Sequence, residues 1–350
     1  MALRLAIDAA NLARDRRGMG RLARPVVRAA TDDPAFAVTL LASKPADARA
    51  LRAEFAGAAV AASRSAGRTG RFDAVWFPFN GMRYSVAAPS LVAIADAFAF
   101  TEAHRDPIAR FREQAPVRRA AREATRIVTI SHWSRTEIAR ELRLPLERIE
   151  VVTPAPDPFW HPGAGDVLPP ELREGRFVLV VGAGEARKNA RLALDACALA
   201  LHGEKEWLVI AGHLSEADRA AARASGVRCG EIAASDALLR GLYRNAAAVL
   251  VPSLAEGFGL VAVEALACGA PVLAADAAAL PEAAGGAATL LDPHDAPAWA
   301  AAIRRLLDDE REAAAARGRA LARFAFTDRT APARRTLELL REVARSGASA

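Results

Sequence analysis

Short apolar runs rich in valine, isoleucine and leucine alternate with alanine-rich helical stretches along the whole chain. This alternation is typical of βα units built around parallel sheets. The predicted strands are 4–9, 37–42, 74–79, 91–95, 127–131 and 149–153, followed by 177–182, 207–211, 248–252, 271–275 and 288–291. Helices are expected at 295–307, 310–324 and 329–343. The sequence therefore predicts an α/β fold with doubly wound, Rossmann-like parallel sheets.

Two domains are expected, because a chain of 350 residues exceeds the size at which a single core stops growing. A proline-rich segment separates the two sets of strands, and its prolines disfavour helix and remove backbone donors. The predicted parts are an N-terminal domain at 1–160, a linker at 161–175, a C-terminal domain at 176–328 and a final helix at 329–350. Such sheets bind ligands at the carboxyl ends of their strands, so we expect a cleft between the domains.

Composition narrows the class of protein. An apolar fraction of 52% and a charged fraction of 25% are those of an ordinary globular protein, and no uncharged run is long enough to span a bilayer. Arg4 and Asp8 interrupt the stretch where a signal peptide would be apolar. The three cysteines lack metal-binding spacing, which suits a reducing compartment. We therefore expect a cytoplasmic protein without a bound metal or cofactor.

Two acidic residues, Glu256 and Glu264, stand in an otherwise uncharged stretch from 252 to 272. A carboxylate on an apolar element is costly unless it meets hydroxyls, cations or amides, so the pair indicates a ligand site. Gly257 and Gly259 let the backbone approach a ligand, and the helix that follows them presents free amides that favour a phosphate.

Lysine is rare in this arginine-rich chain, where only Lys44, Lys188 and Lys205 occur. A retained lysine indicates a need for a compact ammonium, and Lys188 ends the turn that follows the strand 177–182. The same turn carries Gly182 and Gly184, which invites a dehydrogenase interpretation. That interpretation fails because Arg187 occupies the position of the third glycine.

The segment from Glu256 to Glu264, which begins Glu-Gly-Phe-Gly-Leu, resembles the E-x7-E signature of retaining glycosyltransferase family 4. The segments at 241–246 and 277–293 resemble the regions on either side of that signature. This resemblance implies the GT-B fold, with two Rossmann-like domains facing a cleft, an acceptor-side N-terminal domain, and the final helix 329–350 crossing back to that domain. It also implies a retaining, metal-independent, hexosyltransferase-like enzyme that uses a nucleotide-diphosphate sugar.

The resemblance also implies roles for residues of the C-terminal half. Lys188, Arg187 and the backbone amides of Phe258, Gly259 and Leu260 would stabilise the departing diphosphate. Glu264 would hold the ribose hydroxyls. Glu256 would hold the donor sugar and stabilise its oxocarbenium-like state. Gly257 would allow the close approach of the backbone.

In the N-terminal half, Gly18 and Gly20 resemble a glycine-bearing turn that lies across the cleft from the donor phosphates. Asp96 is a candidate catalytic residue at a place where related enzymes have His-Asp, and Ala95 replaces the histidine. A second departure is Ala183, which stands where many members carry an arginine.

The expected function is transfer of a sugar to a hydroxyl of a glycan or lipid-linked acceptor, in the assembly of a glycan, a glycolipid or a cell-envelope polysaccharide. Two alternatives remain, an inactive nucleotide-sugar-binding paralogue and a GT-B hydrolase or epimerase. The arginine-rich stretch Arg105–Arg126 is either a solvated helix or a surface for anionic membrane lipids. Aromatic residues are too sparse in that stretch for nucleic-acid recognition.

Overall fold

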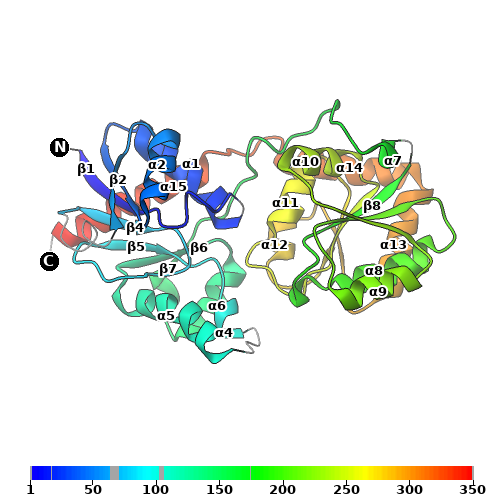
Figure 1. The fold of residues 1–350 in the computed structure, drawn as a ribbon, viewed down its shortest axis with the longest axis horizontal. Helices are drawn as coiled ribbons and strands as arrows, with labels where there is room; N and C mark the ends of the chain where they lie inside the picture. Colours follow the sequence, from blue (N-terminus) through cyan, green and yellow to red (C-terminus); the bar gives the residue numbers. More distant parts are fainter. Residues whose placement is uncertain (1, 17, 64–70, 102–105, 174, 349–350) are drawn as a thin grey trace. The chain divides into compact units, whose positions relative to one another are not determined.

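The computed structural model describes residues 2–16, 18–63, 71–101, 106–173 and 175–348. The chain forms two units (Figure 1). Unit 1 contains Met1–Ala155 together with Thr330–Ala350, and unit 2 contains Pro156–Arg329. Within the described residues, no helix combines the length and the apolar character needed to cross a bilayer.

Unit 1 is built on a parallel sheet with the strand order β3-β2-β1-β4-β5-β6-β7. Its strands are β1 (Leu3–Asp8), β2 (Phe36–Ala42), β3 (Ala59–Ala62), β4 (Ala74–Phe77), β5 (Ser90–Ala93), β6 (Arg126–Thr129) and β7 (Ile149–Val151). The order reverses between β1 and β4, because the chain builds outward through β2 and β3 and then returns to the other side of β1. The carboxyl end of β1 therefore lies at the topological switch point of this sheet.

Helices cover both faces of the unit 1 sheet. They are α1 (Gly18–Asp32), α2 (Pro45–Glu54), α4 (Phe98–Thr101), α5 (Pro107–Glu123), α6 (His132–Leu142), the short 3₁₀ turn η1 (Leu146–Arg148) and α15 (Ala331–Ala348). One hydrophobic cluster joins α1, α2 and α15 to the sheet. A second cluster joins α5 and α6 to the opposite face. The central strands are buried on both faces, which explains their nearly continuous apolar sequences.

Unit 2 contains a second parallel sheet with the order β10-β9-β8-β11-β12-β13. Its strands are β8 (Phe177–Val181), β9 (Trp207–Ala211), β10 (Arg228–Ile232), β11 (Ala248–Val251), β12 (Val272–Ala275) and β13 (Thr289–Leu291). Its helices are α7 (Pro170–Arg173), η2 (Ala186–Lys188), α8 (Ala190–Leu201), α9 (Glu216–Ala224), α10 (Asp236–Asn245), α11 (Leu260–Ala267), α12 (Leu280–Ala284), α13 (Ala296–Asp308) and α14 (Glu310–Phe324). The switch point of this sheet lies between β8 and β11.

All the strands predicted from sequence are present, and so are the last three helices. Two further strands, β3 and β10, were not predicted. Both lie at sheet edges, where β3 consists mainly of alanine and β10 carries Arg228 and Glu231. Edge strands are exposed along one side, so they need no apolar run. Residues 161–175, the predicted linker, lie within unit 2, while α15 packs against α1 in unit 1.

Candidate active site

The predicted donor residues of unit 2 lie on two neighbouring loops at the carboxyl end of its sheet. Because β8 pairs directly with β11, the turn after β8 and the loop after β11 are adjacent. The backbone N–H of Leu254 donates to the carbonyl of Arg187 at 2.8 Å. The Asn189 side-chain amide donates to the carbonyls of Pro252, at 3.2 Å, and Pro293, at 2.9 Å. These bonds fix the lysine-bearing turn to the loop that carries Glu256.

Lys188, Arg187 and Glu256 form the buried part of an ion cluster. The Lys188 Nζ lies 2.6 Å from Glu256 Oε1, and the Arg187 Nη1 lies 3.3 Å from Glu256 Oε2. Glu256 is 8% exposed, and the side chains of both cations are less than one-fifth exposed. Since burial of a charge is costly unless it is paired, each partner makes the burial of the others possible. The Arg187 Nη2 also lies 2.6 Å from Oε2 of the exposed Glu185, so two positive and two negative charges meet at the carboxyl end of the sheet.

The glycine turn after Glu256 leads directly into α11. Gly259 has φ +99°, and a Cβ there would lie 2.6 Å from the Leu280 side chain. Only glycine fits at this position without strain. The backbone amides at the start of α11, beginning at Leu260, therefore lie directly at the end of the glycine loop. Phe258 is buried beneath this turn, and Gly257 links it to Glu256.

Glu264 lies on α11 and is 7% exposed. Its Oε2 accepts a hydrogen bond from the hydroxyl of Tyr243 at 3.3 Å. Tyr243 is fully buried, and its ring contacts Trp160 edge-on at a centroid distance of 5.6 Å. The orientation of Glu264 is therefore coupled to the packing of α10 and of the segment before α7.

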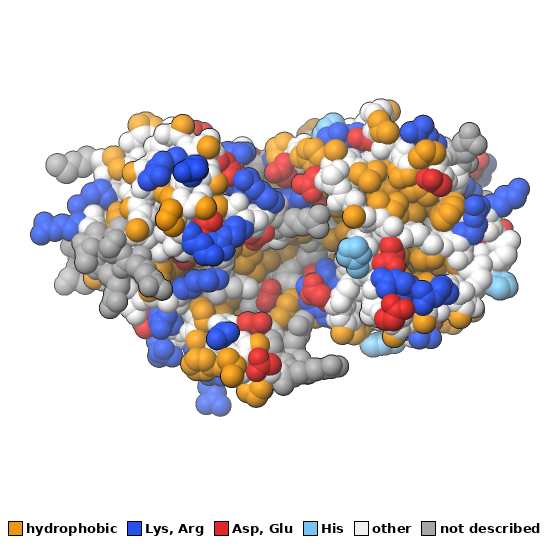
Figure 2. Space-filling model, viewed as in Figure 1, with side chains coloured by type: hydrophobic (Ala, Val, Ile, Leu, Met, Phe, Trp, Pro, Cys, Tyr) orange, Lys and Arg blue, Asp and Glu red, His pale blue; other side chains and the backbone are white. Residues whose placement is uncertain are grey.

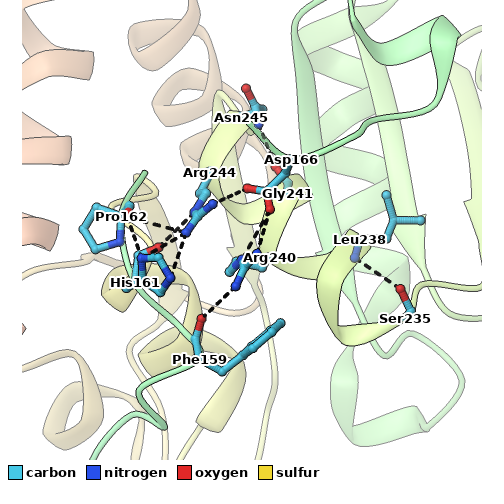
Figure 3. Close-up of polar contacts among 10 residues, drawn as sticks. All are labelled: Phe159, His161, Pro162, Asp166, Ser235, Leu238, Arg240, Gly241, Arg244 and Asn245. Atoms are coloured by element: carbon cyan, nitrogen blue, oxygen red, sulfur yellow. Dashed lines mark hydrogen bonds and ion pairs between the residues drawn. The ribbon is translucent and has the colours of Figure 1, made fainter. Parts of the chain in front are cut away.

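That segment is attached to α10 by a buried ion cluster (Figure 3). Asp166 accepts from both Arg240 and Arg244, and the Arg240 guanidinium lies over the Phe159 ring, 4.4 Å from its centroid. The side chains of Asp166 and Arg244 are 7% and 5% exposed. Arg244 also donates to the carbonyl of His161 at 2.9 Å. Polar bonds thus hold an otherwise irregular segment against the helix that carries Tyr243.

In unit 1, the predicted glycine turn forms the start of α1. Gly18 has φ +48° and begins the helix, while a Cβ on Gly20 would lie 1.9 Å from the carbonyl oxygen of Asp15. The Gly20 N–H donates to Asp15 Oδ2 at 2.9 Å. The close approach of Asp15 thus explains, on structural grounds alone, why this position is a glycine. Asp96 accepts from the Phe98 N–H at 3.1 Å, just before α4.

The structure thus brings Lys188, Arg187 and Glu256 into direct contact. The residues from Gly257 to Leu260 continue the same loop, and Glu264 lies farther along the helix that this loop begins. Gly18, Gly20 and Asp96 belong to unit 1. The ligand roles assigned to all these residues remain predictions.

One buried acid of unit 1 was not singled out from the sequence. Asp8 ends β1, is 3% exposed, and accepts a long hydrogen bond of 3.3 Å from the Ala10 N–H. Burial raises the pKa of Asp8 from 3.8 to about 6, although the Ala10 N–H and the charge of Arg83 act in the opposite direction. The available signal was an acid at the end of an apolar strand, where parallel sheets bind ligands.

Asp8 should make the stability of the chain fall between pH 4 and pH 6. In this window the unfolded chain ionises the carboxyl group, while the folded chain keeps it protonated, so each rise in pH favours unfolding. The Asp8→Asn variant cannot ionise at this position and serves as the reference. Relative to it, the free energy of unfolding of the parent should fall by up to about 3 kcal/mol between pH 4 and pH 6 and stay constant above pH 6. Chemical unfolding of both proteins at several pH values measures the difference. If the unfolding free energies of the two proteins depend on pH in the same way, the pKa of Asp8 is not raised in the folded chain.

The two successive parallel-sheet units define the GT-B class of fold. Sucrose-phosphate synthase from Thermosynechococcus elongatus matches 98% of this chain and 100% of its own, with a TM-score of 0.72 and 17% identity. Anabaena HepE in complex with UDP-glucose matches 99% of this chain and 100% of its own, with a TM-score of 0.71 and 16% identity. At these identities the likeness concerns the fold alone.

Residues 170–322 match the family model described as Glycosyl transferases group 1. The match lies entirely within unit 2. O-antigen chain mannosyltransferase B of Escherichia coli is 34% identical over 213 residues, which make up 56% of each protein. The chain spans about half the length of the curated relatives it matches.

Proposed function

We propose that this chain transfers a glycosyl group from a nucleotide-diphosphate sugar to an acceptor hydroxyl, with retention, as a member of glycosyltransferase family 4. The observation that carries the proposal is the cluster of Lys188, Arg187 and Glu256 beside the glycine turn that starts α11. The family match over unit 2 supports it. The curated relative acts as an O-antigen mannosyltransferase, which supports a glycan or lipid-linked acceptor in cell-envelope assembly.

The chemistry follows from the charges of the cluster. The bond between the anomeric carbon and the diphosphate oxygen breaks as the acceptor oxygen bonds to that carbon, and the acceptor proton passes to the departing diphosphate. Negative charge thus develops on the diphosphate, where Lys188, Arg187 and the first amides of α11 stabilise it. Because the chain supplies these cations itself, the proposed reaction needs neither a metal nor a cofactor. Glu256 holds the donor sugar, and Glu264 holds the ribose hydroxyls.

A screen of nucleotide diphosphates and their sugars tests the donor site. We expect one nucleotide series to raise the melting temperature of the full-length protein, because a ligand that binds only the folded state stabilises it. Lys188→Met should abolish this shift, whereas Lys205→Met, at an exposed position in the same unit, should preserve it. If no nucleotide binds, or if both variants behave alike, the proposed site is wrong.

Product analysis separates transfer from its two alternatives. Release of the nucleotide diphosphate that depends on an added acceptor indicates transfer. Release of free sugar, or formation of a different sugar, without an acceptor indicates a hydrolase or an epimerase. Binding without any turnover over a broad set of acceptors indicates an inactive paralogue.

We also propose a peripheral contact between α5 and an anionic membrane at the cytoplasmic face. Ile108 and Phe111 are 63% and 70% exposed on this helix, and exposed Arg110 and Arg112 adjoin them. Apolar side chains beside arginines suit the interface of an anionic bilayer. Arg105, the start of the predicted basic stretch, lies outside the described residues. On the face shown in Figure 2, basic side chains are interspersed with acidic and apolar ones over both units, which gives no support to a nucleic-acid partner.

Vesicle sedimentation tests the membrane contact. The protein should sediment with vesicles that contain phosphatidylglycerol and stay in solution with phosphatidylcholine alone. Phe111→Ser should reduce the bound fraction. Leu199→Ser, which changes an exposed apolar residue on α8 in unit 2, should leave the bound fraction unchanged. Equal binding by Phe111→Ser and the parent would exclude this helix as the contact.

A further inference from the structure

The carboxylate of Glu264 is bonded to a side chain that the proposed mechanism does not use. Tyr243, on α10, donates its hydroxyl to Glu264 Oε2 at 3.3 Å, and α10 packs against α11. Tyr243 is completely buried, whereas Glu264 keeps a small part of its surface exposed. A ligand in the donor site can therefore meet Glu264 but not Tyr243, so any effect of the tyrosine on binding passes through the acid.

A tyrosine hydroxyl differs from an ammonium or a guanidinium as the partner of a buried acid. It donates one hydrogen bond and carries no charge, so it orients a carboxylate without neutralising it. A carboxylate accepts up to about four hydrogen bonds, and one bond from Tyr243 is compatible with further bonds from two ribose hydroxyls. Glu256, by contrast, is bonded to the cations Lys188 and Arg187. The bond from Tyr243 thus suits an acid that accepts from neutral hydroxyls.

The hydroxyl of Tyr243 is attached to a rigid framework. The Tyr243 ring contacts Trp160 edge-on, and Trp160 is itself buried and contacts Phe159 in the same manner, at a centroid distance of 4.9 Å. A Cβ on Gly241 of α10 would lie 2.8 Å from the Cβ of Asp166, so the segment before α7 lies directly against this helix. A group that is fixed before its ligand arrives loses little conformational entropy on binding.

We propose that Tyr243 is a positioning residue that orients Glu264 toward the ribose, and thereby sets the preference of the donor site for a nucleotide with both ribose hydroxyls. This inference rests on the proposed function, in which Glu264 holds these hydroxyls and Lys188 the diphosphate. Without the Tyr243 hydroxyl, Glu264 keeps its charge but loses its fixed orientation, so its bonds to the ribose weaken. The contacts to the diphosphate are unaffected, because they come from other residues.

Isothermal titration calorimetry on the full-length protein tests this role. The probes are ADP, GDP and UDP, each compared with its 2′,3′-dideoxy counterpart, which lacks both hydroxyls. The parent should bind the ribose form of at least one probe about tenfold or more tightly than the dideoxy form. Tyr243→Phe should weaken binding of the ribose form about tenfold and leave the dideoxy form unchanged, since only the ribose form bonds to Glu264.

Three further variants serve as controls. Tyr84→Phe removes the hydroxyl of the other tyrosine of the chain, in unit 1, and should leave both affinities unchanged. Lys188→Met should weaken binding of both forms alike, because they share the diphosphate. Glu264→Gln should reduce the preference for the ribose form, and adding Tyr243→Phe to it should have little further effect, as expected for a tyrosine that acts through the acid. Cooperative unfolding of each variant shows that it folds.

Fluorine NMR provides a second readout that needs no change at Tyr243. The chain has two tyrosines, so labelling the parent with 3-fluorotyrosine gives two resonances, and Tyr84→Phe identifies that of Tyr243. The ribose form of the bound nucleotide should shift the Tyr243 resonance, because its hydroxyls share the carboxylate of Glu264. The dideoxy form should leave this resonance in place.

The outcomes separate this inference from the proposed function. If no nucleotide binds the parent, the donor site is wrong and the role of Tyr243 falls with it. If a nucleotide binds and Lys188→Met weakens it, the donor site stands. The role of Tyr243 is then overturned by itself if Tyr243→Phe keeps the ribose preference or weakens both forms equally, or if both forms shift the Tyr243 resonance alike.

Discussion

Replacing Lys188 by methionine should lower the rate of sugar transfer by about 10²–10³-fold. Methionine has a similar length but no charge, so the change removes one of the two cations that face the developing charge of the diphosphate. Glu256 then keeps only Arg187, at 3.3 Å, in place of two cationic partners. The variant should have a lower kcat as well as a lower donor affinity, because the negative charge that Lys188 stabilises is largest in the transition state.

Two further variants sharpen this measurement. Lys205→Met removes the exposed lysine of the same unit and should leave kcat within error of the parent. Lys188→Arg restores a positive charge, but a planar guanidinium does not reproduce a compact ammonium 2.6 Å from Glu256 Oε1, so we expect only partial recovery. Full activity in Lys188→Met would show that the cluster has a structural role alone.

Asp166→Ala should destabilise unit 2 by about 3 kcal/mol, because it leaves two arginines without their carboxylate partner. Both partners in the Arg244–Asp166 pair are more than nine-tenths buried, so water cannot replace the lost acid easily (Figure 3). Asp195→Ala is the matched control, since its pair with Arg191 on α8 is exposed. Exposed pairs of this kind contribute about 0.3–0.5 kcal/mol.

The pH dependence of this loss provides a second readout. Burial of Asp166 raises its pKa, but the hydrogen bonds from Arg244 and Arg240 outweigh that effect and hold the pKa below its ordinary value. A lowered pKa means that the stabilisation is complete above the pKa of the unfolded chain and is lost as the pH falls through the folded value. The difference between parent and Asp166→Ala should therefore shrink below about pH 4. A constant difference down to strong acid would show that packing, and not charge, causes the loss.

The strand and helix order could be predicted because it depends on local sequence. Apolar runs such as 177–182 and 248–252 stay apolar because both sheet faces are covered. The edge strands β3 and β10 do not have to be apolar throughout, and they were not predicted. Glu256 and Lys188 could be selected because a charge in an apolar or glycine-rich segment is unusual, and the family match supports the same segment.

The partners of these side chains could not be predicted in the same way. The sequence assigned Lys188 and Arg187 to a diphosphate and Glu256 to a sugar, and it gave no sign that the three side chains contact one another. Asp8 was noted only as an interruption of an apolar segment, because burial at the end of β1 depends on strands far along the chain. Asp166 likewise acquires its role from arginines more than 70 residues away.

The amino-acid order alone determined which segments become strands and helices, and which charged residues stand in apolar surroundings, since both follow from neighbours within a few positions. Only the tertiary structure decided that β8 lies beside β11 and thereby brings Lys188 to Glu256, 68 residues apart in sequence. Burial, ion pairing and the pKa of a group such as Asp8 depend on what packs around it, and chain folding sets that environment through contacts that no local pattern records.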